Sequence, residues 1–153
     1  MAIRLNKFKR LLSSHTLMAL DSMCFIYHFA DHPRYAQLTN QIFELLETGK
    51  NKATTSTISV IESLVLPEKQ NNQLICYEYE KVFRNHPNLR ILAVDFNISR
   101  LTAKLRAKYP FLKTPDAIQI SSGLISGCSL FITNDKKLAK VKEITIAILD
   151  DYI

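Results

Sequence analysis

Short apolar runs alternate with longer amphipathic segments along the whole chain, and this alternation restricts the fold more than any other feature. Five runs have the length and the apolar or β-branched content of buried strands. They cover residues 16–20, 53–56, 89–94, 129–133 and 144–149. Strands that alternate with helices usually form a parallel sheet with helices on both faces. We therefore predict an α/β fold, a three-layer α/β/α sandwich around a mainly parallel sheet of about five strands.

The segments between these runs have helical periodicity and helix signals at their ends. The predicted helices cover residues 22–30, 35–46, 57–66, 73–84, 96–108, 114–127 and 134–140. Gly49 is placed to end the second helix. Pro67 is expected to interrupt the helix that begins at Thr57, because proline cannot donate a hydrogen bond inside a helix. Thr114 is the expected N-cap of the sixth helix, with Pro115 in its first turn.

The length and composition fit one domain. With 153 residues, of which 47% are hydrophobic, the chain can bury a single substantial core. We expect residues 16–153 to form this domain and residues 1–15 to form a basic N-terminal arm or helix. No apolar run approaches the roughly 18 residues that a membrane span needs, and the first ten residues lack the apolar stretch of a secretory signal. A cytoplasmic protein without a membrane partner is therefore expected.

Cysteine and glycine usage excludes two kinds of site. Cys24, Cys76 and Cys128 are widely spaced in apolar segments and include no Cys-x-x-Cys pair, so we expect reduced core residues and no zinc site. The chain has only three glycines, and none forms a Walker or Rossmann phosphate loop. An ordinary nucleotide-binding enzyme is therefore not expected.

The net charge favours a polyanionic partner. Lysine and arginine outnumber the acidic residues by 20 to 14, which gives a formal charge of +6. Such a balance is typical of proteins that bind nucleic acid, although many basic proteins bind none. Three lysines near predicted strand or helix ends are our candidates for contacts with the phosphates of a nucleic acid: Lys52, Lys113 and Lys136.

Acidic residues follow two of the predicted strands, at the edge of the sheet where ligands bind in open α/β folds. Asp21 directly follows the run 16–20, and Asp135 comes two residues after the run 129–133. Each precedes a predicted helix, so either residue can also be a helix cap.

Two further acids lie in predicted helices. Glu62 interrupts an apolar segment in which a buried, unpaired carboxylate would be costly, so we expect it to have a partner unless it faces solvent. Ser59 lies one turn earlier, where its hydroxyl can orient the carboxylate or a bound water. Asp116 lies in the first turn of a helix, a position that also stabilises the helix through its dipole.

Together, the four acids predict a metal site. Carboxylates that share one crevice repel each other and raise each other's pKa unless a cation neutralises them. Oxygen-only ligands favour Mg²⁺ or Mn²⁺, and such an ion promotes hydrolysis of phosphodiester bonds. We assign Asp21, Glu62, Asp116 and Asp135 as metal ligands and catalytic residues. Four polar neighbours are expected to support them: Ser22, Ser59, Thr133 and Asn134.

The order and spacing of these motifs resemble the PIN-domain family, and within it the small prokaryotic nucleases that include VapC-type toxins. The motifs that resemble the family's four acidic motifs are Leu20-Asp21-Ser22, Ser59-x-x-Glu62, Lys113-Thr114-Pro115-Asp116-Ala117-Ile118-Gln119 and Phe131-Ile132-Thr133-Asn134-Asp135. The resemblance implies Mg²⁺- or Mn²⁺-dependent cleavage of RNA, a homodimer and, in the toxin branch, inhibition by a small antitoxin protein. We accordingly predict an endoribonuclease that is the toxin of a type II toxin–antitoxin pair.

Three other functions fit the sequence less well than a nuclease. A catalytically inactive PIN-fold module that binds RNA or protein is favoured only by Met23, which stands where the family often has asparagine. A phosphatase of the haloacid dehalogenase type needs a second aspartate at that same position, so it does not fit. A response-regulator receiver domain needs acidic neighbours early in the chain, and Asp21 has none.

Overall fold

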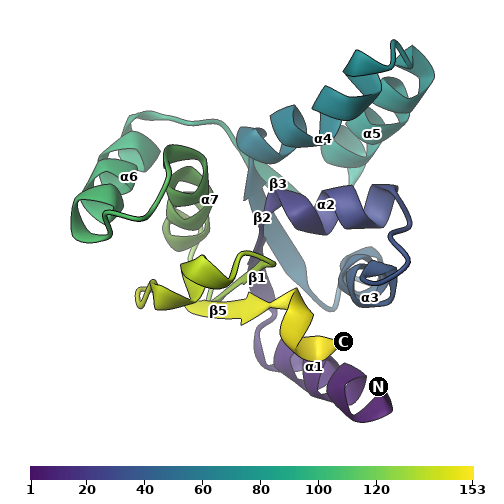
Figure 1. The fold of residues 1–153 in the computed structure, drawn as a ribbon, viewed down its shortest axis with the longest axis horizontal. Coiled ribbons are helices and arrows are strands. Elements are labelled where there is room, and N and C mark those ends of the chain that lie inside the picture. Colours follow the sequence, from purple (N-terminus) through teal and green to yellow (C-terminus); the bar gives the residue numbers. More distant parts are fainter.

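The five strands form one sheet in which every neighbouring pair is parallel. The computed structural model describes residues 1–153. Its strands are β1 (Leu17–Leu20), β2 (Lys52–Ser56), β3 (Leu89–Leu92), β4 (Leu130–Thr133) and β5 (Thr145–Ile148). Their order across the sheet is β3-β2-β1-β4-β5 (Figure 1). The chain therefore changes direction across the sheet between β1 and β4, and such a reversal opens a crevice at the carboxyl ends of the two strands.

Helices cover both faces of this sheet. The α-helices are α1 (Ala2–Ser14), α2 (Ser22–Phe29), α3 (Ala36–Glu47), α4 (Thr57–Lys69), α5 (Gln73–Asn85), α6 (Phe96–Lys108) and α7 (Thr114–Ile125), and the 3₁₀ helices η1 (Lys136–Lys140) and η2 (Leu149–Tyr152) follow β4 and β5. In Figure 1, α6 and α7 lie on one face, α2 and α3 cover the other, and α4 and α5 extend together away from the sheet. The predicted α/β/α sandwich is thus confirmed. None of the helices combines the length and the apolar character needed to cross a lipid bilayer.

Consecutive residues of the central strand enter different cores, as the alternation of a strand requires. Met18 and Leu20 belong to the buried cluster that includes Phe25 of α2. Ala19 belongs to a second cluster with Ile120 of α7. The two cores lie on opposite faces of the sheet, and both contribute to holding β1 in place.

Helix α7 approaches β1 closely at Gly123. A Cβ atom at this position would lie 2.6 Å from the Cβ atom of Ala19, which is too short for two carbon atoms. Glycine therefore allows α7 to lie directly on the central strand. This packing fixes the helix whose first turn contains Asp116.

The N-terminal residues form a helix that packs on the domain. Phe8 and Leu12 of α1 are fully buried in the same core cluster as β1. The ring of Phe8 lies 5.0 Å from that of Tyr152 in η2, and Figure 1 shows α1 beside the C-terminus. Of the two alternatives for this segment, the structure has the helix, while the division of the chain at residue 15 stays a prediction.

Two details of the helices differ from the prediction. Helix α4 continues through Pro67 to Lys69, because proline in the last turn costs a single hydrogen bond and Pro67 is itself buried. Thr114 is the first residue of α7 and not its N-cap, which is Lys113. Pro115 has no N–H, so this helix start has one fewer amide that needs a cap.

Smaller sequence predictions are confirmed. Gly49, just beyond α3, has a φ of +73°, a left-handed conformation that glycine adopts readily. Cys24, Cys76 and Cys128 are free thiols, and all three are buried.

Candidate active site

Asp21 lies in the crevice at the carboxyl end of β1, where it is also the N-cap of α2. It is only 7% exposed. The backbone N–H of Ser22 donates to one carboxylate oxygen over 2.8 Å, and the hydroxyl of Thr133 donates to the other over 2.6 Å. Burial raises the pKa of the Asp21 carboxyl from 3.8 to about 6, although both hydrogen bonds lower it. Asp21 is therefore a helix cap and, at the same time, a buried acid held in one orientation.

Thr133, at the end of β4, connects Asp21 with Asp135. Its oxygen accepts a hydrogen bond from the backbone N–H of Asp135 over 3.1 Å, while its hydroxyl proton is donated to Asp21. Asp135 is exposed, and its carboxylate caps η1 by accepting from the N–H of Lys137 over 3.0 Å. One buried hydroxyl thus lies between the two acids that follow β1 and β4.

Asp116 and Glu62 come from α7 and α4, and they differ in their surroundings. Asp116 is half-buried in the first turn of α7. Glu62 is exposed and forms no hydrogen bond or ion pair with the protein, so the partner that we expected is absent. Glu62 therefore faces solvent, the second of the two possibilities given for it, and its charge does not reduce the stability of the fold through burial.

Burial and neighbouring carboxylates raise the pKa of both Asp21 and Asp116. Besides burial, the charges of Asp116 and Glu62 raise the pKa of Asp21. The pKa of Asp116 is raised by burial first, then by the charges of Asp135 and Glu62, and it is lowered by the charge of Lys113. These carboxylates therefore lie within range of mutual repulsion, which a bound cation would relieve.

The donor chemistry of these acids fits a divalent cation, while their spacing is wider than a closed site. All four offer only oxygen, as Mg²⁺ and Mn²⁺ prefer. However, no three His, Cys, Asp or Glu side chains lie close enough together to hold one ion. Glu62 is exposed and without a hydrogen bond, Asp135 is exposed and caps η1, and Asp21 is held by its two hydrogen bonds. Asp21 would be the ligand already fixed in place for a bound divalent cation, and Glu62 would have to move to reach it.

A buried amide for which no role is predicted from the sequence lies next to these acids. Gln119 of α7 is 2% exposed. Its Oε1 accepts hydrogen bonds from the backbone N–H and the hydroxyl of Ser56, over 3.2 and 2.7 Å. Its Nε2 donates to the hydroxyls of Ser22 and Ser59, over 3.1 and 2.7 Å. The available signal was a long polar side chain one helical turn after Asp116, in a segment otherwise made of small or apolar residues.

Two of the predicted supporting residues make contacts other than those expected. Ser59 is fully buried, and its hydroxyl bonds Gln119 and Thr55 instead of Glu62. Asn134 donates to the hydroxyl of Tyr27 over 3.2 Å and accepts from the N–H of Asp150 over 2.9 Å. Ser59 therefore supports the interior of the site, and Asn134 holds the turn that leads to Asp135.

The three candidate lysines lie in different places. Lys52 begins β2 and is paired with Leu17, the first residue of β1, so it lies at the edge of the sheet opposite to the acids. This removes Lys52 as a phosphate contact at the acidic crevice. Lys113 is exposed beside Asp116, whose pKa its charge lowers. Lys136 forms an ion pair of 3.1 Å with Asp150, so its charge is partly neutralised.

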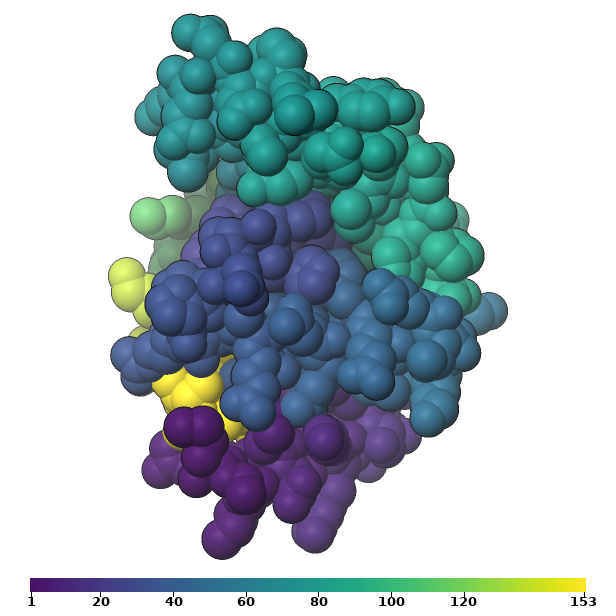
Figure 2. Space-filling view, turned by 90° about the vertical axis from the view of Figure 1, so that its right-hand side faces the viewer, coloured from purple at the N-terminus to yellow at the C-terminus, as the bar shows by residue number.

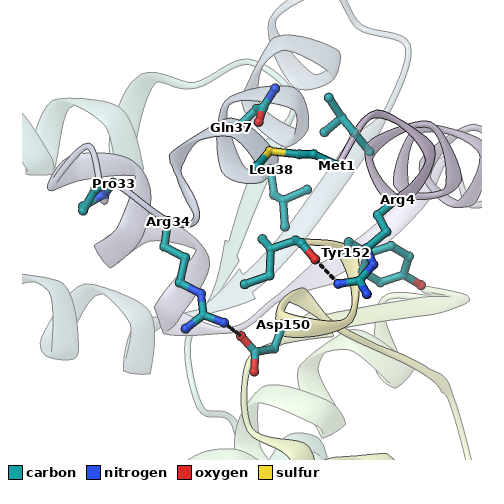
Figure 3. A pocket seen from close by; sticks show the side chains of 10 residues that line it. Met1, Arg4, Pro33, Arg34, Gln37, Leu38, Asp150 and Tyr152 are labelled. Atoms are coloured by element: carbon teal, nitrogen blue, oxygen red, sulfur yellow. Dashed lines mark hydrogen bonds and ion pairs between the residues drawn. The ribbon is translucent and has the colours of Figure 1, made fainter.

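A cavity of about 520 Å³ lies away from the four acids, between α1, the segment before α3, and η2 (Figure 3). Across it, Arg34 forms an ion pair of 3.3 Å with Asp150. Asp150 also accepts a hydrogen bond of 2.8 Å from the hydroxyl of Tyr35. The cavity contains none of the predicted site residues, and we assign it no part in catalysis.

Helices α4 and α5 expose an unusual amount of apolar surface. Ile61, Leu66, Leu74 and Tyr77 are each at least 59% exposed. In Figure 2 this part of the chain, coloured teal, forms the upper lobe of the molecule. Ile61 directly precedes Glu62, so the apolar surface begins at the edge of the acidic crevice. Exposed apolar patches of this kind commonly mark a protein interface.

Comparison with solved structures identifies several proteins with the same fold, one of which is a toxin–antitoxin complex. The chain is similar to VapBC2 from Rickettsia felis, determined bound to a DNA fragment from their promoter (15% identity, TM-score 0.67, 86% of this chain and 98% of that chain). It is also similar to a toxin–antitoxin complex from Klebsiella pneumoniae (20% identity, TM-score 0.61, 88% of this chain and 97% of that chain). A third similar structure is FitAcB from Neisseria gonorrhoeae (18% identity, TM-score 0.61, 87% of this chain and 97% of that chain). At these identities the likeness establishes the fold alone.

Sequence comparison gives the family. No curated protein matches the chain. The family model of the PIN domain, however, matches residues 18–144, which include all four acids, most of β1 and the whole of β2, β3 and β4. The chain therefore belongs to the PIN-domain family.

Proposed function

We propose that this protein is a Mg²⁺- or Mn²⁺-dependent endoribonuclease and the toxin of a type II toxin–antitoxin pair. The observation that supports this most strongly is the buried Asp21 at the switch point of the sheet, where burial and the charges of Asp116 and Glu62 raise its pKa to about 6. An acid in this environment is costly unless a cation binds it. PIN domains are in general nucleases that use divalent metal ions.

In this proposal Asp21, Glu62, Asp116 and Asp135 hold the metal ion. When bound, the ion activates a water molecule and stabilises the charge on the scissile phosphate. The protein's own part is to fix the ligands: Thr133 and the N–H of Ser22 hold Asp21 in one orientation. Lys113 is exposed beside Asp116 and is placed to attract a phosphate of the RNA backbone.

The proposed partner is a small antitoxin protein. The solved structures similar to this chain include a toxin–antitoxin complex. On this chain, the exposed side chains of α4 and α5 beginning at Ile61 offer apolar surface beside the acidic crevice. A partner that covers this surface would also block access to Glu62. The homodimer and the cytoplasmic location stay predictions of the sequence.

The first test is cleavage of structured RNAs by the purified protein with Mg²⁺, Mn²⁺ or EDTA. We expect cutting that needs a divalent ion and that is lost in Asp21→Asn. Asp151→Asn is a matched control, because Asp151 is an exposed acid of η2 outside the crevice. Equal cutting by wild type and Asp21→Asn would contradict the proposed site.

The alternative is a catalytically inactive PIN-fold module that binds RNA or protein. Met23, where the family often has asparagine, favours it. RNA binding without cleavage at any metal concentration would support this alternative over the nuclease.

A further inference from the structure

We propose that Gln119 is a positioning residue that sets the relative placement of three metal-binding acids, Asp21, Glu62 and Asp116. The inference rests on the proposed function, since it takes these acids as ligands. It concerns the polar network that joins the elements from which the ligands come, and none of its members needs to touch the metal or the RNA.

Gln119 is the point where three segments of the chain meet. Its Nε2 donates to Ser22, the residue after Asp21, and to Ser59, which lies one turn before Glu62 on α4. Gln119 itself lies one turn after Asp116 on α7. Gln119 and the two acceptors of its Nε2 are therefore each adjacent, directly or by one helical turn, to one of the three acids.

The orientation of the amide is determined by its neighbours. The backbone N–H of Ser56 can only donate, so the atom that it faces over 3.2 Å must be the Oε1 oxygen of Gln119. The hydroxyl of Ser56 donates to the same oxygen over 2.7 Å. Nε2 then faces Ser22 and Ser59, and both of its hydrogens are used.

The hydroxyl protons of the network agree with this orientation. Thr55 donates to the carbonyl oxygen of Leu20 over 2.8 Å, which is shorter than its 3.4 Å contact with Gln119. Because Thr55 has only one proton, Ser59 donates to Thr55 over 2.7 Å. Ser59 must then accept from Gln119, as the amide orientation requires.

The network therefore fixes both neighbours of Asp21. Thr55 holds the carbonyl of Leu20, and Gln119 holds the hydroxyl of Ser22. All five polar residues of the network, Gln119, Ser22, Thr55, Ser56 and Ser59, are at most 2% exposed, so water cannot replace a lost bond without entering the core. Removing the amide would leave several buried polar atoms unpaired and free the three segments to shift relative to one another.

A second buried hydrogen bond of α7 gives a matched control. Two residues after Gln119, the hydroxyl of Ser121 accepts from Thr102 of α6 over 3.1 Å. Ser121 is fully buried, but its bond joins α7 to α6, an element without any of the four acids. Ser121→Ala therefore loses stability through α7 without breaking the network at the acids.

The experiment is titration of Mn²⁺ into wild type, Gln119→Met and Ser121→Ala by calorimetry, at a temperature where all three are folded, together with Mn²⁺-dependent RNA cleavage. Methionine keeps the length of the side chain and removes its hydrogen bonds. We expect Gln119→Met to raise the Kd for Mn²⁺ by about 10- to 100-fold, as losses of ligand-supporting residues do. Higher Mn²⁺ should restore much of its cleavage, whereas Ser121→Ala should bind Mn²⁺ as wild type does.

A second variant covers the case in which Gln119→Met does not fold. Ser59→Ala removes one acceptor of the amide, and it should raise the Kd for Mn²⁺ by a smaller factor with an unchanged KM for RNA. If the folded network variants bind Mn²⁺ as tightly as wild type, the inference is wrong although the nuclease can stand. If wild type itself neither binds Mn²⁺ nor cuts RNA, the proposed function fails, and the inference fails with it.

Discussion

The inner and outer halves of the acidic site differ in how they are held. The inner half contains Asp21, buried and bonded to Thr133 and Ser22, next to the buried amide of Gln119. The outer half contains Glu62, exposed and without a partner, and Asp135, exposed and occupied as the cap of η1. Folding alone determines the geometry of the inner half. In the outer half, folding fixes Asp135 only through its cap of η1, and the geometry of Glu62 depends on what binds there.

This difference assigns separate tasks to acids that look equivalent in the sequence. An acid fixed before binding loses little conformational entropy when a metal arrives, but its burial reduces the stability of the metal-free protein. An exposed acid has no such cost, and it must be ordered on binding. The predictions below test this division, beginning with the largest expected effect.

Asp21→Asn should reduce metal-dependent RNA cleavage by more than about a hundredfold, the upper range for losing a residue that only supports a ligand. The reason is that the variant loses the one ligand that is already held in place. Initial rates at saturating Mn²⁺ measure this effect. A loss no larger than that in Glu62→Gln would contradict the special role of the inner half.

The same variant should stabilise the metal-free protein at pH 7.5 by up to about 3 kcal/mol, since one pKa unit corresponds to about 1.4 kcal/mol. The folded pKa of Asp21 lies near 6, above its ordinary value of 3.8. Between these values the folded state binds more protons than the unfolded state, so wild-type stability falls as pH rises through this window. Asparagine can still accept from Ser22 and can donate to Thr133.

Urea unfolding of both proteins at several pH values, in EDTA, measures this gain. The difference between Asp21→Asn and wild type should be small near pH 4 and complete above about pH 6. A gain that is independent of pH would show that the titration of Asp21 is not its cause.

Glu62→Gln should reduce cleavage by about 10- to 100-fold and change the free energy of unfolding by less than about 0.5 kcal/mol, as exposed substitutions usually do. Its side chain has no protein partner to lose. Cleavage assays test the expected loss of activity, and urea unfolding of the same preparation tests the expected small change in stability. Clear destabilisation would mean that Glu62 belongs to the inner half.

Thr133→Val should reduce cleavage by about tenfold and destabilise the protein by about 1–3 kcal/mol. Valine keeps the shape of threonine but leaves one oxygen of Asp21 without its donor and the N–H of Asp135 without its acceptor. Thr145→Val is a control on the exposed start of β5. Equal behaviour of the two variants would argue against Thr133 as the link between the acids.

The smallest effect is expected at the lysines. Lys113→Ala should weaken RNA binding a few-fold and reduce the slope of log Kd against log salt by about one, whereas Lys52→Ala should change neither. Lys113 lies beside Asp116, while Lys52 lies at the opposite edge of the sheet. Salt-dependent binding to catalytically inactive Asp21→Asn protein avoids interference from cleavage. If both substitutions weakened RNA binding equally, the RNA would have to contact both edges of the sheet and not only the edge with the acids.

The fold was predictable because its signal is distributed over the whole chain. Five apolar runs and the helices between them appear in the sequence, and each strand lies within about two residues of its predicted bounds. Pro67 and Thr114 were misjudged because local preferences of single residues were followed where the packing of a whole helix decides.

The positions of Asp21 and Asp135 at strand ends were also predictable, because parallel strands bring their carboxyl ends to one edge. The exposure of Glu62 and the placement of Lys52 were not, since they depend on how α4 leaves the sheet and on the direction of β2. The role of Gln119 was not predictable, because its five hydrogen-bonding contacts come from segments about 60 and 100 positions away in the sequence. A helical pattern shows which residues share a face, but not which polar groups meet across the core.

The contact of Gly123 with Ala19 makes the site sensitive to a methyl group far from any acid. Gly123 lies seven residues after Asp116 on the same helix, which is about 10 Å along the helix axis. A larger residue at position 123 must move the C-terminal end of α7 away from β1. Because the helix is stiff, this also shifts its N-terminal end, which contains Asp116. If the proposed site is right, an alanine at this position should impair activity while all four carboxylates stay intact, so the presence of the acids alone would not establish that a related chain is active.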